Sequence, residues 1–179
     1  DEKRIIKQRK EIEKVNKKLR GITVLHGTEV NIKDDGTLDM ENKILSQFDI
    51  VIAAIHSGFK NPKEKMTKRI VKSMENENVD IIAHPTGRLI TKRESYEIDL
   101  DKILDAAKKT NTVLEINSYP ERMDLKDVHA RAAVKAGVKL AISTDAHNTD
   151  QLHFIKLGIG TASRGWARKE DIINTRSLK

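Results

Sequence analysis

The stretch IVIAAIHS, at residues 50–57, is an almost unbroken apolar run that ends beside a histidine. Four further stretches are also rich in apolar residues and contain polar side chains near their ends: TVLHGTEV at 23–30, VDIIAHP at 79–85, TVLEINS at 112–118 and KLAISTDAH at 139–147. Nearly continuous apolar runs are typical of strands that are buried on both faces of a parallel sheet. These stretches therefore predict a parallel α/β sheet or barrel that is covered by helices.

Each stretch ends at or near a side chain that can bind a metal ion, namely Glu29, His56, His84, Glu115 and Asp145. Successive members of this set are 27, 28, 31 and 30 residues apart. That spacing is about one strand, one helix and two loops, and such units bring the C-terminal ends of parallel strands around one point. We therefore expect a polar cluster of carboxylates and imidazoles, which are ligands that suit Mn, Zn or Fe.

Helical patterns lie between the apolar stretches, at residues 2–19, 63–74, 100–109 and 127–136. The first strand is expected within 22–32, and the segment LGIGTA at 157–162 is interpreted as a sixth and last strand. Ligand-type residues at the ends of many strands, rather than at one switch point, favour a barrel over a doubly wound sheet. A full eight-unit barrel usually takes about 250 residues, so six strands indicate a small or partial barrel.

The length and composition predict one domain, residues 1–179. The sequence contains no cysteine. This excludes a disulfide framework and thiolate metal ligands, and it is consistent with a cytoplasmic protein. No apolar stretch approaches the roughly 18–20 residues that span a bilayer, so no membrane partner is expected. The formal charge of +7 has two interpretations that the sequence leaves open: a charged solvated surface, or attraction to polyanions such as nucleic acid.

Two pairs of polar residues near strand ends need separate interpretations. Asp145 and His147 stand at positions i and i+2, which point the same way on a strand. Glu115 and Asn117 share one strand, and we expect only one of them to face the site. Asn117 is nearer the strand end and is the better candidate, as a substrate-binding or supporting group. The histidines that we interpret as structural or surface residues are His26, His129 and His153.

Several cations lie in the loops near the predicted cluster: Arg88, Lys92, Arg93, Arg122 and Arg164. Guanidinium groups suit bidentate contact with phosphate, and Arg88, four residues after His84, is the strongest candidate. Metal ions flanked by arginines suggest hydrolysis of a phosphate ester. We therefore predict substrate or phosphate contacts for Arg88, Lys92, Arg93, Arg164 and Asn117.

Six motifs carry a resemblance to a known family: GTEV at 27–30, AIHSGF at 54–59, AHPTGRL at 83–89, LEINSYPERMDL at 114–125, STDAH at 143–147 and GTASRGWARKEDIINT at 160–175. In this order they resemble the polymerase and histidinol phosphatase (PHP) domain, in particular the version at the C-terminus of bacterial and archaeal family X DNA polymerases. The resemblance implies a distorted seven-stranded βα barrel, similar to a TIM barrel, with a trinuclear centre that is usually Mn or Zn.

Residue by residue, the resemblance implies a set of metal ligands. Glu29 matches a bridging glutamate, His56 and His84 match histidine ligands, and Asp145 and His147 match the final ligand pair. All five would bind metal, with Glu29, Asp145 and His147 also acting in catalysis.

The chain also departs from the family pattern. A strand with an H-x-H motif, a further histidine, and a second strand that ends in a T-D-H-type motif are not present. We therefore expect an incomplete barrel that lacks about the first two strands. About one metal ion or fewer, in place of up to three, would bind, and the chain by itself would be weakly active or inactive. Exposed barrel edges would also favour self-association.

The resemblance implies a metal-dependent phosphodiesterase that acts as a 3′-to-5′ exonuclease on DNA 3′ ends during repair, with the polymerase domain of the same parent chain as a partner. Two alternatives stay open. One is a non-catalytic module that binds DNA or a polymerase through a basic surface, and the other is a histidinol-phosphatase-like enzyme for small phosphate esters. A metal-dependent amidohydrolase fits the ligand types, but such barrels commonly use a carboxylated lysine, and no lysine ends a strand here.

Overall fold

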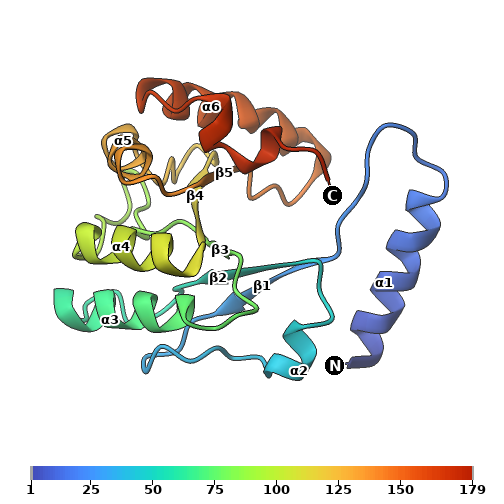
Figure 1. The fold of residues 1–179 in the computed structure, drawn as a ribbon, viewed down its shortest axis with the longest axis horizontal. Coiled ribbons are helices and arrows are strands. Elements are labelled where there is room, and N and C mark those ends of the chain that lie inside the picture. The colour runs from blue at the N-terminus through green and yellow to red at the C-terminus, as the bar shows by residue number, and fades with distance from the viewer. Residues whose placement is uncertain (1, 179) are drawn as a thin grey trace.

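The computed structural model describes residues 2–178, in which helices pack against a five-stranded parallel sheet (Figure 1). The strands are β1 (Gly27–Asn31), β2 (Ile50–Ala54), β3 (Ile81–Ile82), β4 (Val113–Asn117) and β5 (Leu140–Ser143). The α-helices are α1 (Glu2–Asn16), α2 (Asn42–Leu45), α3 (Lys63–Met74), α4 (Leu100–Thr110), α5 (Asp127–Ala136) and α6 (Ile155–Arg164). Short 3-10 helices are η1 (Thr149–Phe154), η2 (Lys169–Asp171) and η3 (Ile173–Thr175). The predicted α/β class is confirmed.

The strands lie in the sheet in the order of the sequence, β1-β2-β3-β4-β5, and every neighbouring pair is parallel. A doubly wound sheet reverses its direction at a switch point, whereas a barrel adds each strand on the same side of the previous one. The observed order is therefore consistent with a barrel-like arrangement. The seven-stranded type and its incompleteness stay predictions. Within residues 2–178, no helix is long and apolar enough to cross a membrane.

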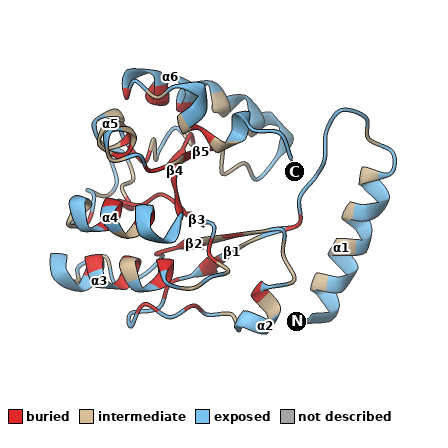
Figure 2. Cartoon of the chain, in the orientation of Figure 1, coloured by how far each residue is buried: buried red, intermediate tan, exposed pale blue. Residues whose placement is uncertain are grey.

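The main hydrophobic core lies between the sheet and helices α3, α4 and α5 (Figure 2). Every second strand residue points into it, including Val51, Leu114 and Leu140. The alternate residues form a smaller apolar cluster around Ile81 and Val113 on the opposite face. Because residues two apart share a face, this second face is also the one on which the polar residues of the strand ends must gather.

Helix ends follow local signals in the sequence. The side chain of Asp99 accepts a hydrogen bond from the backbone of Lys102 and caps the start of α4. Gly137, with φ of 79°, ends α5 in the left-handed conformation that glycine adopts without strain. The predicted helices at 63–74 and 127–136 are observed with those bounds.

The predicted strand at 157–162 is wrong, because these residues belong to helix α6. Its buried positions are Gly158, Thr161 and Ala162, which are three and four residues apart and therefore share one helical face. A Cβ atom on Gly158 would lie 2.0 Å from Oγ of Ser118. The glycine therefore lets the helix approach β4 closely. The prediction failed because an apolar run of this length is too short for its periodicity to distinguish a strand from a helix.

Helix α1 is attached differently from the other long helices. It contains no buried residue, and Figure 1 shows it beside the sheet at the end of a long linker. Its described attachments are mostly polar: Gln8 to His26, Arg9 to Asp49, and Asn16 to the backbone of Val24. The linker takes up residues 17–26, including the first part of the predicted strand, so the observed strand is shorter and begins at Gly27.

Candidate metal centre

Three of the predicted ligands come together where the first three strands end. Glu29 lies in β1, while His56 and His84 each follow the last residue of β2 or β3 by two positions. One ligand atom from each of the three residues lies within 4.8 Å of the others. The strands that carry them are parallel neighbours in the sheet, which is why residues far apart in sequence meet here. One carboxylate and two imidazoles are donors that Zn, Mn and Fe accept.

Asn31 sets the tautomer of His56. Its amide nitrogen Nδ2 donates to Oδ2 of Asp39, so its oxygen Oδ1 faces the ring and lies 2.7 Å from Nδ1 of His56. The ring nitrogen Nδ1 therefore carries the proton, and Nε2 is free to act as a ligand. The sequence interpretation did not single out Asn31, although its place two residues after Glu29 on one strand was an available signal.

A cation is required between His56 and Glu29. Nε2 of His56 lies 3.2 Å from Oε1 of Glu29, and in the neutral ring both atoms would offer lone pairs to each other. A proton on Nε2 is one such cation, and the resulting hydrogen bond holds the pKa of Glu29 below its usual range. A divalent ion is another, so the geometry of these two side chains fits a metal site.

His84 is the most buried member of the cluster. Its side chain is almost fully enclosed, and Nδ1 has no hydrogen-bond partner among the described residues. Burial lowers the pKa of His84 to about 4, and the positive charge of Arg122 acts in the same direction. The imidazole is therefore neutral near pH 7, which is the form that binds metal ions.

Glu115 holds the backbone of His84 in an unusual conformation. His84 has a φ of 31°, within the left-handed region that residues other than glycine rarely adopt. Its backbone N–H donates to Oε2 of Glu115 at 2.6 Å, and the hydroxyl of Ser143 donates to the other oxygen of this carboxylate. Burial raises the pKa of Glu115 to about 7. Strained residues of this kind are concentrated at functional sites.

The expectation that only one of Glu115 and Asn117 faces the site is wrong. Residues i and i+2 of a strand point to the same face, and both side chains are buried on the face opposite the helices. Glu115 supports His84, as described above. Asn117 donates from Nδ2 to Oδ2 of Asp145 at 3.2 Å.

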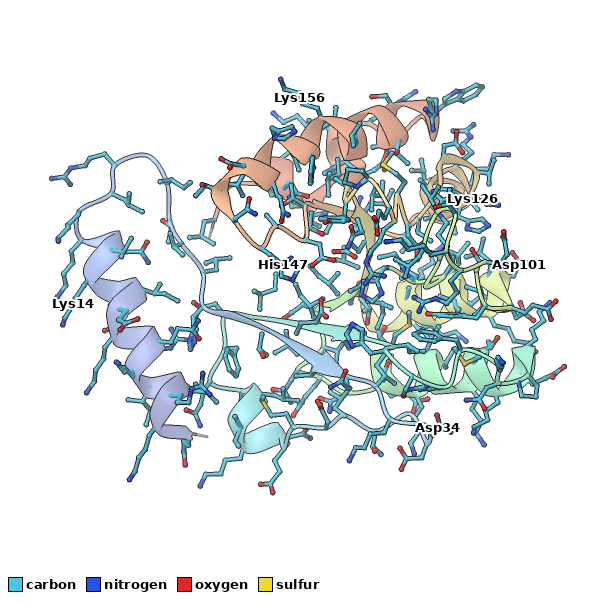
Figure 3. All side chains as sticks on the ribbon, turned by 180° about the vertical axis from the view of Figure 1, so that it is seen from behind. Lys14, Asp34, Asp101, Lys126, His147 and Lys156 are labelled. Atoms are coloured by element: carbon cyan, nitrogen blue, oxygen red, sulfur yellow. The ribbon has the colours of Figure 1, made fainter. Side chains whose placement is uncertain are left out.

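Asp145 and His147 lie outside the three-residue cluster. Asp145, with a φ of 52°, accepts from Asn117, and its negative charge opposes the lowering of the pKa of His84. His147 is labelled in Figure 3 and is largely exposed. Its Nδ1 lies 2.7 Å from the backbone oxygen of Asp145. The structure thus places Asp145 next to the cluster, and the roles of Asp145 and His147 as metal ligands or catalytic groups stay predictions.

Arg122 brings positive charge to this face of the sheet. Its Nε lies 3.4 Å from Oδ2 of Asp145, and only 18% of its side chain is exposed. Its charge acts to lower the pKa values of both Glu29 and His84. A guanidinium in this position can attract an anion to the cluster.

Two loops after β3 and β4 clasp each other through Arg88 and Asp124. Arg88 donates to the backbone oxygen atoms of Arg122 and Met123. In return, Asp124 accepts from the backbone and the hydroxyl of Thr86, at 3.0 and 2.9 Å. Burial raises the pKa of Asp124 to about 6. Arg88, which was predicted to contact phosphate, therefore holds the backbone that carries Arg122.

The other predicted phosphate-binding cations have partners of their own. Lys92 pairs with Glu121 at 2.8 Å, and Arg164 pairs with Asp127 at 2.9 Å. Arg93 donates to the backbone oxygen of Gly87 and lies over the ring of Phe59, 3.7 Å from its centroid. The structure does not bring these cations together with the three ligands, and their contact with substrate stays a prediction.

The histidines interpreted as structural or surface residues lie away from the cluster. His26 is fully buried, its ring is tilted by 47° against that of Phe48 with centroids 4.7 Å apart, and it contacts Gln8 of α1. His153 is exposed, and His129 is partly buried on α5. None of the three belongs to a group of potential ligands within residues 2–178.

Comparisons with known proteins found relatives that cover most of the chain. The chain is 46% identical over 176 residues to the DNA polymerase/3′-5′ exonuclease PolX of Bacillus subtilis (strain 168), which covers 98% of the chain and 31% of that protein. It is 38% identical over 140 residues to a probable phosphatase of Thermoanaerobacter sp. (strain X514), covering 73% of the chain and 55% of that protein. A probable phosphatase of Clostridium novyi (strain NT) is 32% identical over 182 residues, which covers 91% of the chain and 68% of that protein.

The chain therefore spans about a third of the PolX relative and about half of the first phosphatase. A scan against protein-family models gave no match.

Proposed function

Because the chain belongs to the polymerase and histidinol phosphatase (PHP) family of phosphoesterases, we propose that its metal centre hydrolyses phosphodiester bonds at DNA 3′ ends. The family follows from the similarity to PolX and to the probable phosphatases. The choice of DNA follows from PolX, whose name includes a 3′-5′ exonuclease and which has the highest identity of the three relatives described.

The single observation that carries the proposal is the convergence of Glu29, His56 and His84 at three strand ends. Their ligand atoms lie within 4.8 Å of one another, and the environment keeps Glu29 ionised and His84 neutral. Nδ1 of His84 has no hydrogen-bond partner among the described residues, as is also true of Nδ1 of His26 and His129, so the argument rests on the convergence of the three ligand atoms.

One group of residues would bind a metal cation, and another would bind the phosphate anion. Glu29, His56 and His84 would hold a divalent ion, Mn or Zn in the first instance, which supplies Lewis-acid chemistry toward a phosphoryl group. Asn31 and Glu115 keep the two histidines in their binding orientation. Arg122, oriented by Asp145, would bind an oxygen of the scissile phosphate.

We expect the isolated chain to be a weak enzyme. Residues 2–178 gather one group of three potential ligands, whereas two-metal sites clamp both the attacking and the leaving oxygen of the displacement. With a single ion bound, only one of the two oxygens would be next to a metal ion. Arg122 would then have to stabilise the negative charge on the other oxygen.

The test is removal of nucleotides from a 3′-labelled single-stranded DNA in Mn²⁺, followed on a sequencing gel. We expect slow trimming that Glu29→Gln and His84→Ala each reduce at least about tenfold, because each removes a ligand. His153→Ala, a change of an exposed histidine outside the cluster, is the matched control and should trim at the unmodified rate.

Trimming that survives chelation by EDTA, or that is unchanged in both ligand variants, would contradict the proposed site. Fast trimming that His84→Ala abolishes would preserve the site and contradict only the weak activity. Elemental analysis of the purified chain adds an independent readout, with about one ion per chain expected and a clear loss in His84→Ala.

A small-molecule phosphatase is the second candidate, because the relatives from Thermoanaerobacter and Clostridium novyi are named as probable phosphatases. Both functions would use the same three ligands and Arg122. They are separated by substrate: turnover of a small phosphomonoester without any DNA trimming would favour the phosphatase.

The similarity to PolX also suggests where this activity acts. We propose that a polymerase domain in the same parent chain is the partner that shares DNA 3′ ends with this domain, as in repair synthesis. Co-expression of the two parts and a pull-down in high salt would test a direct contact.

A further inference from the structure

The positive charge of this protein is concentrated at one end of the sequence. Residues 2–20 contain nine lysines and arginines and three glutamates, a net charge of +6. Residues 21–179 contain 25 basic and 23 acidic residues, a net charge of only +2. Most of the basic excess therefore belongs to helix α1 and the turn that follows it, and the body of the protein is close to neutral.

The lysines of this region form a row along one side of the helix. Lys7, Lys10 and Lys14 of α1 and Lys17 just after it recur at steps of three, four and three residues. The backbone N–H of Lys17 still donates to the backbone oxygen of Glu13, as in a helix, so the four lysines share one helical face. All four are exposed, and none forms an ion pair with an acidic residue within 2–178. Lys14 lies on the outer side of α1, away from the sheet (Figure 3).

The opposite side of α1 faces the body of the protein. Gln8, Arg9 and Asn16 make the polar contacts described above, and Ile5 and Ile12 on the same side are half-buried. Ile5 and Ile12 are thus turned partly inward, while Ile6, Val15 and the lysines are exposed. An amphipathic helix that inserts into a membrane surface needs its apolar face free for lipid and often carries Trp or Phe, and α1 has neither aromatic residue.

We propose that this lysine row of α1 binds the sugar–phosphate backbone of nucleic acid without regard to base sequence. The row from Lys7 to Lys17 spans ten residues, or about 15 Å of helix, enough to meet several phosphates of one strand. Lysine binds phosphate as a point charge, and the release of counterions from the nucleic acid supplies the driving force. Uncompensated charge on an exposed helix matches the uniform negative charge of that partner.

This inference deepens the proposed function, on which it rests for the identity of the substrate. It gives DNA a second attachment on the β1 side of the molecule, separate from the ligands at the strand ends. It requires neither a bound metal ion nor hydrolysis, so the two proposals can fail separately.

The test measures binding of a fluorescent 20-nucleotide oligo-dT to the full chain by anisotropy, in EDTA, across a series of KCl concentrations. Replacing Lys7, Lys10, Lys14 and Lys17 together by Gln removes the row while keeping residues of similar helix propensity. Each phosphate contact on a single strand contributes about 0.7 to the slope of log affinity against log salt concentration. Loss of four contacts should therefore make this slope shallower by up to about 3. The corresponding Lys→Arg variant should retain the slope.

The matched control replaces four exposed lysines of the body, Lys108, Lys109, Lys135 and Lys156, by Gln. It changes the net charge by the same amount and should leave the slope nearly unchanged. Equal losses in both variants, or no loss in either, would overturn the proposal. Stronger row-dependent binding to phosphatidylserine vesicles than to oligo-dT would also overturn it, in favour of a membrane surface. If the chain trims DNA but its affinity for oligo-dT does not depend on the lysine row, the lysine-row proposal is overturned and the proposed metal site is not.

Discussion

Helix α1 and the sheet with its covering helices are both rich in charged residues, yet their charges have different environments. In the body, Arg69 is almost fully buried, and its guanidinium donates to the backbone oxygen atoms of Ile32 and Ser57. Asp124 and Glu115 likewise accept hydrogen bonds in buried positions. On α1, Lys10 and Lys14 stand in solvent without a partner among the described residues.

The environment of a charge in this chain indicates its role. Where a charge is buried and hydrogen-bonded, its role is to position neighbouring groups, because leaving it unpaired would be costly. Where charges of one sign stand exposed in a row, the protein itself does not use them for folding, and they are available to a partner. Substitutions in the two regions should therefore have different effects.

The largest effect is expected from the core of the body. Leu114 is fully buried in β4, so Leu114→Ala should lower the free energy of unfolding by roughly 2–5 kcal/mol through lost burial and a cavity. Ile12→Ala on α1 is the counterpart, and because α1 buries no residue it should cost less than about 1 kcal/mol. Urea denaturation checks both. Equal losses would show that α1 belongs to the same packed unit.

The next effect concerns the clasp and its dependence on pH. Burial favours the protonated carboxyl of Asp124, whose pKa rises from 3.8 to about 6. Its stabilising contribution is therefore complete below about pH 4 and is lost as the pH rises through 6, a change of up to about 3 kcal/mol. Asp124→Asn should lack this decline when urea denaturation in EDTA is compared between pH 4 and 7.5. Parallel pH profiles for the two proteins would contradict the assignment.

A smaller change is expected at the support of His56. Asn31→Ala removes the acceptor that fixes Nδ1, so the affinity for Zn²⁺ or Mn²⁺ should fall roughly 10- to 100-fold with little change in folding. Isothermal titration calorimetry measures this directly. Ser46→Ala, a change at an exposed hydroxyl outside the site, serves as the control. An unchanged affinity in Asn31→Ala would mean that His56 does not bind metal through Nε2.

The smallest effect is expected at the attachment of α1. The ion pair of Arg9 with Asp49 is about one-third exposed on both sides, so its loss in Arg9→Ala should cost at most about 1 kcal/mol. Hydrogen exchange should nevertheless accelerate in α1 while the amides of β2 and β4 stay protected. Faster exchange throughout the sheet would show that α1 stabilises the body.

Much of the site could be predicted because it depends on topology alone. Regular spacing placed Glu29, His56 and His84 at strand ends, and parallel order made those ends meet. The alternation of residues along a strand would also have indicated Asn31 and placed Glu115 beside Asn117. The prediction erred on the second pair because it assigned neighbours two apart to opposite faces.

Other features depend on which loops pack together, and no local pattern contains that information. In the sequence, Arg88 is the strongest candidate for a phosphate contact, and Arg122 is one of several cations in nearby loops. The clasp turns Arg88 to the backbone of Met123 and leaves Arg122 beside Asp145. Asp39, which orients Asn31, had no signal at all, because its partner is fixed by the turn between β1 and α2.

The sequence by itself determined the α/β class, the bounds of α3 and α5, and the family, since apolar period, turn residues and motif order are local properties of the chain. Only the tertiary structure decided that residues 155–164 form a helix against β4 and β5, that Arg88 serves as a positioning group, and that the lysines of α1 face away from the body. These outcomes depend on burial and on the competition between partners distant in sequence, which exist only once the chain has folded.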